Sequence, residues 1–184
     1  GVAAKRMLGN LVQYLRTSLG RTRNRETTLA EEVGLLAAYL DIFAIRMGDR
    51  LSYNIDIPAD LAPHPFAPLL LQPLVENAVI HGLDPKIDGG HIHISAKKKG
   101  AWLQLEVSDD GIGFNPTAPP GIGLTNVRER LENLFDPSGR LSIESGSPAG
   151  VRAVIAVPLA SRSTPAAPGH RREPQENEVR AYGR

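Results

Sequence analysis

Residues 108–114 (SDDGIGF) place two carboxylates and two glycines at the end of an alternating segment. Residues 103–107 alternate between apolar and polar side chains, which predicts a half-buried strand that leads into Asp109. A carboxylate at such a strand end can accept a hydrogen bond from an exocyclic amine, as adenine presents, worth roughly 1.5–3 kcal/mol. Gly111 and Gly113 lack a Cβ atom, so the backbone can turn sharply there and lie close to a flat ring.

A second glycine pair, Gly121 and Gly123, follows a proline-rich spacer and precedes an amphipathic segment. We expect a helix from Thr125 onward, because the apolar residues recur there at helical spacing. The N-terminus of a helix offers unpaired N–H groups and the positive end of its dipole to an anion. Gly-x-Gly before a helix is a weak signal alone, since it is neither the dinucleotide pattern nor a P-loop.

An apolar helix predicted over residues 69–82 carries three polar side chains, Glu76, Asn77 and His81. Asn77 offers a neutral oxygen, a suitable ligand for Mg²⁺, which usually completes its shell with substrate phosphates and waters. A Glu-Asn pair on an apolar helix is by itself usually a solvated edge, and Asp-Asp-Gly-Ile-Gly is by itself more often a turn. The order and spacing of the three segments together are more specific, and they indicate a nucleotide site.

The three segments resemble the motifs of the GHKL ATP-binding fold. Residues 69–82 (LLLQPLVENAVIHG) are similar to its N box, residues 109–113 (DDGIG) to its G1 box and residues 121–124 (GIGL) to its G2 box. With residues 123–131 (GLTNVRERL), they most resemble the LytS-like sensor histidine kinases. The resemblance covers about residues 4–159 and implies an α+β fold. That fold is a two-layer α/β sandwich of the Bergerat type, binding ATP under a flexible lid and preceded by an α-helical hairpin.

The resemblance assigns expected roles to individual residues. Asp109 would bind the adenine amine, Asn77 would bind Mg²⁺, and Glu76 would lie near the metal or the attacking group. The other nucleotide contacts that it implies are His81, Gly111, Gly113, Gly121, Gly123, Leu124 and Asn126.

Three positions depart from the usual pattern of this family. The family often has Asn at the position of Asp110, Lys at that of Ile80 and Thr at that of Val151. The Lys would supply a phosphate or surface charge, and the Thr would support the adenine contact. We therefore expect the departures to reduce nucleotide affinity.

Two helices are expected before the first strand. Residues 3–19 carry a leucine stripe, and Thr28 with Glu31 matches a capping box that begins a second helix. The apolar residues of this second helix step by 4, 3, 4, 3 and 4: Leu29, Val33, Leu36, Leu40, Phe43 and Met47. Such a seam fits either an amphipathic helix packed on its own domain or a hairpin that dimerises into a four-helix bundle. The resemblance favours the second interpretation.

The remaining segments complete the predicted domains. Strands are expected over 51–57, 91–98, 101–108, 141–145 and 151–159, which with the helices indicate α+β layering. We assign residues 1–48 to the C-terminal part of the dimerisation hairpin, 49–160 to the ATP-binding domain and 161–184 to a disordered tail. The tail contains no Leu, Ile or Phe, so it cannot bury enough apolar surface to offset chain entropy.

Composition limits the function classes. The net charge of +1 gives no reason to invoke nucleic acid, and the absence of cysteine excludes disulfides and thiolate metal sites. No apolar run approaches the roughly 18 residues of a membrane span. Because the chain begins with Gly1, we expect it to be part of a longer protein. By resemblance, this part would be cytoplasmic and the parent protein anchored in the bacterial inner membrane through segments absent here.

The resemblance implies the catalytic ATP-binding domain of a two-component sensor histidine kinase, with a response regulator as partner and a homodimer formed through the hairpin. The phosphoacceptor motif of such kinases, Asn-Pro-His-Phe-Leu-Phe-Asn, does not occur in this sequence. None of the five histidines suits that role, and the pair His91 and His93 lacks a third metal ligand. Two alternatives stay open: an anti-sigma-type serine kinase, and a degenerate dimerisation and docking module that does not use ATP.

Overall fold

The computed structural model describes residues 27–113, 121–135 and 138–159. Their centre is a five-stranded sheet in the order β2-β4-β5-β7-β6, with β2 parallel to β4 and the other neighbours antiparallel. The strands are β2 (Leu51–Asp56), β4 (Gly90–Lys99), β5 (Trp102–Asp109), β6 (Arg140–Ser145) and β7 (Val151–Pro158). A separate short ladder pairs β1 (Thr27–Thr28) with β3 (Pro65–Phe66).

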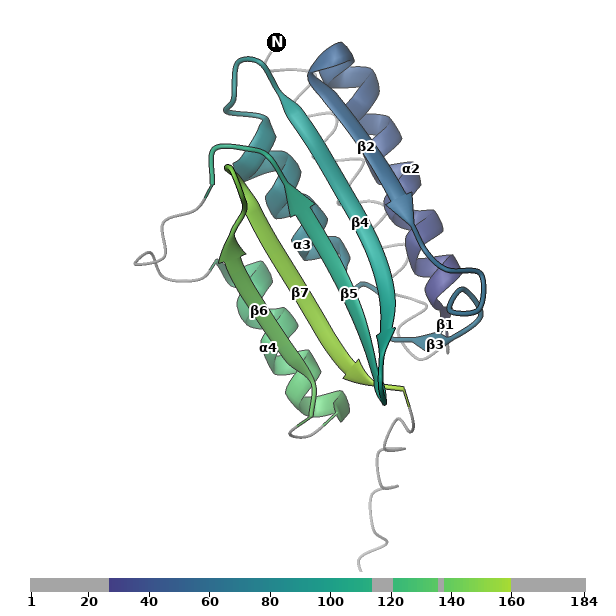
Figure 1. Cartoon of the computed structure of the whole chain (residues 1–184). Coiled ribbons are helices and arrows are strands. Elements are labelled where there is room, and N and C mark those ends of the chain that lie inside the picture. The colour runs from purple at the N-terminus through teal and green to yellow at the C-terminus, as the bar shows by residue number, and fades with distance from the viewer. Residues whose placement is uncertain (1–26, 114–120, 136–137, 160–184) are drawn as a thin grey trace, which may run out of the picture.

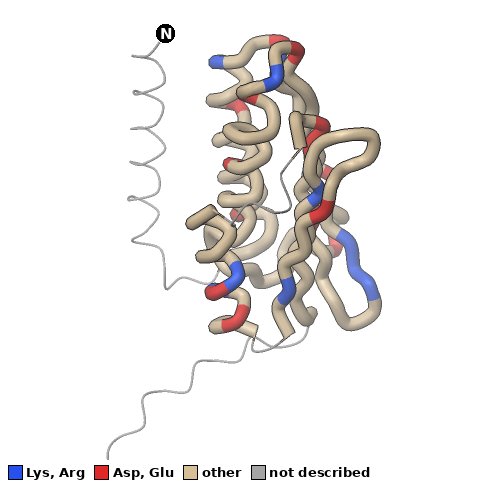
Figure 2. The backbone as a smooth tube through the Cα atoms, turned by 90° about the vertical axis from the view of Figure 1, so that its left-hand side faces the viewer, with Lys and Arg blue, Asp and Glu red and all other residues tan. Residues whose placement is uncertain are grey.

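Among the described residues, three helices cover one face of the sheet and none covers the other (Figure 1). They are α2 (Leu29–Met47), α3 (Gln72–Asn77) and α4 (Ile122–Phe135). A 3₁₀ turn, η1 (Gly48–Arg50), follows α2, and a π-helical segment, η2 (Ala78–Leu83), continues α3. Figure 2 shows the two layers from the side. This is the two-layer α+β architecture expected from the sequence.

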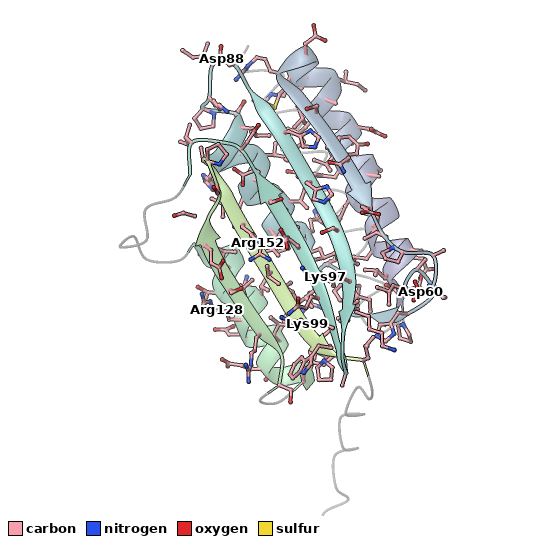
Figure 3. The ribbon with its side chains drawn as sticks, viewed as in Figure 1. Asp60, Asp88, Lys97, Lys99, Arg128 and Arg152 are labelled. Atoms are coloured by element: carbon pink, nitrogen blue, oxygen red, sulfur yellow. The ribbon has the colours of Figure 1, made fainter. Side chains whose placement is uncertain are left out.

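Alternation along β5 explains why the sheet has one covered and one open face. Leu103, Leu105 and Val107 are buried beneath the helices, whereas the residues between them are only half-buried. The open face is correspondingly polar, and Figure 3 shows Lys97, Lys99 and Arg152 on it. The period of two continues to the end of the strand, so Asp109 falls on the helical side.

Helix α2 begins with the predicted capping box. The Thr28 hydroxyl accepts a hydrogen bond from the Glu31 N–H at 3.2 Å, and the Glu31 carboxylate accepts one from the Thr28 N–H at 2.9 Å. The apolar seam of this helix is buried in the same core as the sheet: Leu29, Leu36, Leu40, Phe43 and Met47. In the described residues, this seam therefore packs on the chain's own domain, and dimerisation through a hairpin stays a prediction.

The helix predicted over 3–19 and the tail 161–184 lie outside the described residues. The assignment of residues 1–48 to a dimerisation hairpin stays a prediction for that reason. In the part of the chain that the structure describes, no helix is both long and apolar enough to cross a bilayer.

Two helix boundaries differ from the sequence prediction. The helix expected from Leu69 begins at Gln72, because Leu69 has a φ of 57°, which a right-handed helix does not accommodate. The helix expected from Thr125 begins one turn earlier, at Ile122. Its first turn is closed by the Gly121 carbonyl, which accepts hydrogen bonds from the N–H groups of Leu124 and Thr125, each at 3.1 Å.

Candidate functional site

Asp109 is the last residue of β5, where it pairs with Ile92 on one neighbouring strand and Val151 on the other. It is only 8% exposed. Its Oδ1 accepts a hydrogen bond from the Gly111 N–H at 2.9 Å. Burial raises the pKa of Asp109 above its ordinary value of 3.8, although the backbone N–H groups of Gly111 and Val151 act to lower it. The site thus contains a buried carboxylate that is held by the N–H of the turn that follows it.

Gly111 and Gly82 bring the turn after Asp109 against the helical layer. A Cβ on Gly111 would lie 2.4 Å from the carbonyl carbon and oxygen of Gly82, so only glycine fits. The Ile112 N–H donates to the Gly82 carbonyl at 3.0 Å, which joins the two segments. A Cβ on Gly82 would in turn lie 2.8 Å from the Asp109 Oδ1. The end of η2 and the Asp-Asp-Gly turn therefore pack as one unit around the carboxylate.

Gly150 closes the site from the β7 side. It has a φ of +88°, and a Cβ there would lie 1.8 Å from the Asp109 carbonyl oxygen. Gly113 also has a positive φ, +81°, but meets only the Gly150 carbonyl oxygen, at 3.7 Å. Sequence reasoning missed Gly82 and Gly150 as site residues. The available signals were the glycine that ends residues 69–82 and the glycine that precedes the predicted strand 151–159, since an isolated glycine can mark a close backbone approach.

The polar residues of the predicted helix 69–82 lie on one continuous helical stretch, formed by α3 and η2. Asn77 is the last residue of α3 and is half-buried, and His81 is exposed on η2. Glu76 is half-buried and accepts a hydrogen bond from the Gln72 side-chain amide at 3.0 Å. The stretch continues to Gly82, which lies against Asp109. It thereby connects the predicted metal ligand to the buried carboxylate.

The second glycine pair lies at the start of α4. Gly123 packs against α3, because a Cβ there would lie 3.5 Å from the Cβ of Pro73. Gly121 has nothing within 4 Å of the corresponding position, so it faces open space. Leu124 is half-buried against the core, and Asn126 is exposed. The structure brings the first turn of α4 against α3, whereas the spacer 114–120 lies outside the described residues.

Residues 66–161 match the model of a family described as histidine kinase-, DNA gyrase B- and HSP90-like ATPases. The chain belongs to this family. Residues 2–51 match a second family model, described as histidine kinase. The GHKL resemblance drawn from the three sequence motifs is therefore confirmed.

The chain is also similar to individual sensor kinases. It is 35% identical over 152 residues to the sensor histidine kinase BtsS of Escherichia coli, and this match covers 80% of this chain and 27% of BtsS. It is 29% identical over 171 residues to the sensor protein LytS of Staphylococcus epidermidis, covering 86% of this chain and 29% of LytS. The chain thus spans less than a third of the length of these relatives.

A similar solved structure is the histidine kinase ThkA in complex with the response regulator TrrA. The TM-score is 0.54 at 16% identity, and the match covers 85% of this chain and 49% of that one. At this identity the likeness shows the fold alone.

The departure at Asp110 is explained by local structure. Its Oδ1 accepts a hydrogen bond from the His91 N–H at 2.7 Å, and Lys86 donates to its backbone carbonyl at 2.7 Å. The Lys86 ammonium also lies 3.9 Å from the Asp110 carboxylate. The Asn that histidine kinase-like ATPases often have here could accept the same bond through its amide oxygen. Asp110 therefore holds the start of β4 through the His91 N–H, and its negative charge also acts to raise the pKa of Asp109.

The donor set suits a magnesium ion that is held mainly by substrate. Among the described residues, no three or more His, Asp or Glu side chains are grouped to hold a metal ion. Mg²⁺ in ATP sites commonly uses one or two protein ligands and completes its shell with phosphates and water, which Asn77 fits. The His91 ring nitrogens lie 2.9 Å from the Ser52 hydroxyl and 2.5 Å from the Asn54 side-chain oxygen. Both ring nitrogens of His91 thus already have hydrogen-bond partners, which argues against a metal site formed with His93.

A cavity of about 750 Å³ lies elsewhere, beside β6 and α4, and its lining includes Trp102, Arg128 and Arg140. It contains none of the predicted nucleotide contacts. Volume alone identifies no chemistry, whereas the environment of Asp109 combines a buried carboxylate with glycines that allow close approach. We therefore place the candidate site of this histidine kinase-like ATPase at Asp109.

Proposed function

We propose that this chain is the ATP-binding catalytic domain of a two-component sensor histidine kinase and that it binds Mg-ATP at Asp109. The observation that carries the proposal is the buried Asp109 carboxylate, which accepts a hydrogen bond from the Gly111 N–H and is enclosed by glycines. A buried charged acceptor is suited to an amine donor such as that of adenine, since leaving it unpaired would be unfavourable.

Each segment has a distinct proposed role. Asp109 accepts the adenine amine, and Gly111 and Gly113 let the backbone lie beside the ring. Asn77 holds Mg²⁺, which when bound neutralises phosphate charge during transfer, and Glu76 lies near the metal or the attacking group. The remaining contacts to the nucleotide come from His81, Gly121, Gly123, Leu124 and Asn126. Phosphoryl transfer needs chiefly positioning and charge stabilisation from the protein, and these residues can supply both.

The whole protein is proposed to transfer the γ-phosphoryl group of ATP to a histidine that this chain lacks. A response regulator is the proposed acceptor of that group, which the complex of the similar ThkA with TrrA supports. We propose dimerisation through the N-terminal helical segment. Membrane anchoring would come from parts of the protein outside this chain, which spans 27% of BtsS. The chain itself would then lie in the cytoplasm.

Titration calorimetry of Mg-ATP tests the proposal. Asp109→Asn keeps the size of the side chain but removes its charge, so we expect affinity to fall about 10-fold to 100-fold. Asp60→Asn is the matched control, because Asp60 is exposed in the loop after β2 (Figure 3) and should leave affinity unchanged. Absence of binding to the folded wild-type chain would overturn the proposal and favour the docking module that does not use ATP.

A further inference from the structure

A buried carboxylate outside the nucleotide site, Glu32 on α2, holds the turn that precedes α3. It is 2% exposed. Its Oε2 accepts a hydrogen bond from the Leu69 N–H at 2.8 Å, and its Oε1 accepts one from the Leu71 N–H at 3.1 Å. The backbone N–H of Leu70, between these two donors, also acts to lower the pKa of Glu32. Leu71, the N-cap residue of α3, makes no side-chain cap bond of its own, and the Glu32 carboxylate of another helix accepts its N–H instead.

The backbone of this turn has an unusual conformation. Leu69 is the one residue other than glycine with positive φ in the part of the chain that the structure describes, at 57°. Backbone N–H groups that point into a common concavity suit an anion, and here the N–H groups of Leu69 and Leu71 donate to one carboxylate. Side chains with a Cβ rarely adopt this conformation unless the surroundings hold them there. The Glu32 carboxylate occupies the concavity and thereby stabilises it.

The same turn is held on its carbonyl side by α4. Arg130 donates from Nη1 to the Leu69 carbonyl at 3.2 Å and from Nη2 to the Pro68 carbonyl at 2.8 Å. Its charge also acts to lower the pKa of Glu32, which burial raises. Figure 1 shows α3 lying between α2 and α4. Glu32 therefore binds the N–H groups of this turn and Arg130 binds its carbonyl groups. The turn leads directly into the helix that carries Asn77.

Arg130 lies on the same helix as the second glycine pair. Gly123 packs against Pro73 at the start of α4, and Arg130 follows seven residues later, about two helical turns. Helix α4 thus meets α3 and the turn before it at two separate points. These two contacts determine where the glycines at the start of α4 lie relative to Asn77.

We propose that Glu32 and Arg130 are positioning residues that align Gly121 and Gly123, at the start of α4, with the end of α3 that carries Asn77. This inference rests on the proposed Mg-ATP function. Binding of the phosphates and metal needs both helices in register, whereas binding of the adenine ring depends on Asp109, which belongs to the sheet. Loss of these hydrogen bonds should therefore reduce the affinity for Mg-ATP far more than the affinity for adenosine.

The test compares Arg130→Met with Arg128→Met, which removes the same charge from an exposed position on the same helix. We expect Arg130→Met to weaken Mg-ATP binding about 10-fold, with adenosine affinity changed less than about 2-fold, and Arg128→Met to change neither. Arg130→Lys should restore only part of the affinity, because an ammonium cannot make the two parallel bonds of a guanidinium. Glu32→Gln should act in the same direction as Arg130→Met. Equal losses for Mg-ATP and adenosine, or no loss, would contradict the inference.

Hydrogen exchange on the chain without nucleotide separates failure of this inference from failure of the proposed function. In Arg130→Met, the amides of Leu69, Leu71 and the first turn of α4 should exchange faster, while those of β5 keep their wild-type rates. If the wild-type chain does not bind Mg-ATP, the proposed function is wrong. The local exchange pattern still decides whether the hydrogen bonds of Arg130 align the helices. Uniformly faster exchange across the sheet would indicate general destabilisation and would contradict the positioning role.

Discussion

Gly111 lies so close to Gly82 that a Cβ on Gly111 would come within 2.4 Å of the Gly82 carbonyl carbon. The two glycines are 29 residues apart in the sequence, and the contact joins the end of β5 to the helical layer. The glycines of this site consequently serve different purposes. Some permit packing in the absence of a ligand, while others leave room for a ligand or for movement.

Alanine substitutions should separate these purposes. Gly111→Ala should lower the free energy of unfolding by about 3 kcal/mol, because the new methyl group overlaps backbone atoms that cannot move aside. Gly113→Ala should cost about 1 kcal/mol, since its positive φ is unfavourable but the space is open. Gly121→Ala should stay within about 0.5 kcal/mol. Urea unfolding measures all three, and a Gly111→Ala chain as stable as wild type would refute the packing role.

Val151→Thr should strengthen adenine binding. Val151 pairs directly with Asp109, and directly paired residues of an antiparallel ladder present their side chains on the same face. A threonine hydroxyl at this position would lie beside the carboxylate and could support its contact with the amine. We expect the Kd for adenosine to fall about 5-fold, the value of one hydrogen bond of roughly 1 kcal/mol.

Val154→Thr is the matched control for that variant, because Val154 is on the same strand but on the opposite face. Its affinity for adenosine should equal that of wild type. Equal effects of the two substitutions on affinity would show that the hydroxyl does not act at Asp109.

Ile80→Lys should strengthen Mg-ATP binding without changing stability. Ile80 is 45% exposed on η2, one residue before His81, so a lysine can extend into solvent there at little cost. An added positive charge near the phosphates should improve Mg-ATP affinity about 3-fold at low salt, and the gain should shrink as ionic strength rises. Ile45→Lys, on the exposed side of α2, is the control. A similar gain for adenosine would place the effect away from the phosphates.

The stability of the chain should depend on pH through Asp109. Burial raises the pKa of Asp109 above 3.8 in the folded chain, so the folded state binds that proton more strongly than the unfolded state. Its contribution is therefore fully present below pH 3.8 and is lost as the pH rises through the raised value. Denaturant unfolding from about pH 3 to 7 should show wild type losing stability relative to Asp109→Asn, and then a constant difference.

Glu106 provides a control of opposite sign in the same assay. Its hydrogen bonds to Arg152, at 2.9 and 2.7 Å, lower the pKa of Glu106 below 4.5. The stability that it contributes is present above pH 4.5 and is lost as the pH falls through the lowered value. Wild type should therefore lose stability relative to Glu106→Gln on acidification. The same direction of change for both carboxylates would contradict the assignments.

The sequence by itself determined the features that depend on local patterns. Alternation with a period of two places Asp109 at the end of β5 on the buried side, and the capping box at Thr28 begins α2 where expected. The glycine turn after Asp109 follows from the same short segment. These features are readable because each depends on residues a few positions apart, whose backbone conformation and side-chain direction are set locally.

Only the tertiary structure decided which surfaces meet. The apolar seam of α2 suited either a second helix or the sheet, and burial of Leu36 and Leu40 in the sheet's core favours the sheet. Nothing in the sequence indicated that Glu32 would cap a turn 37 residues later, or that Arg130 would grip the same turn from the other side. Periodicity says that a helix has a buried face but not what covers it. The partners of a buried charge are selected by where three separate helices come together.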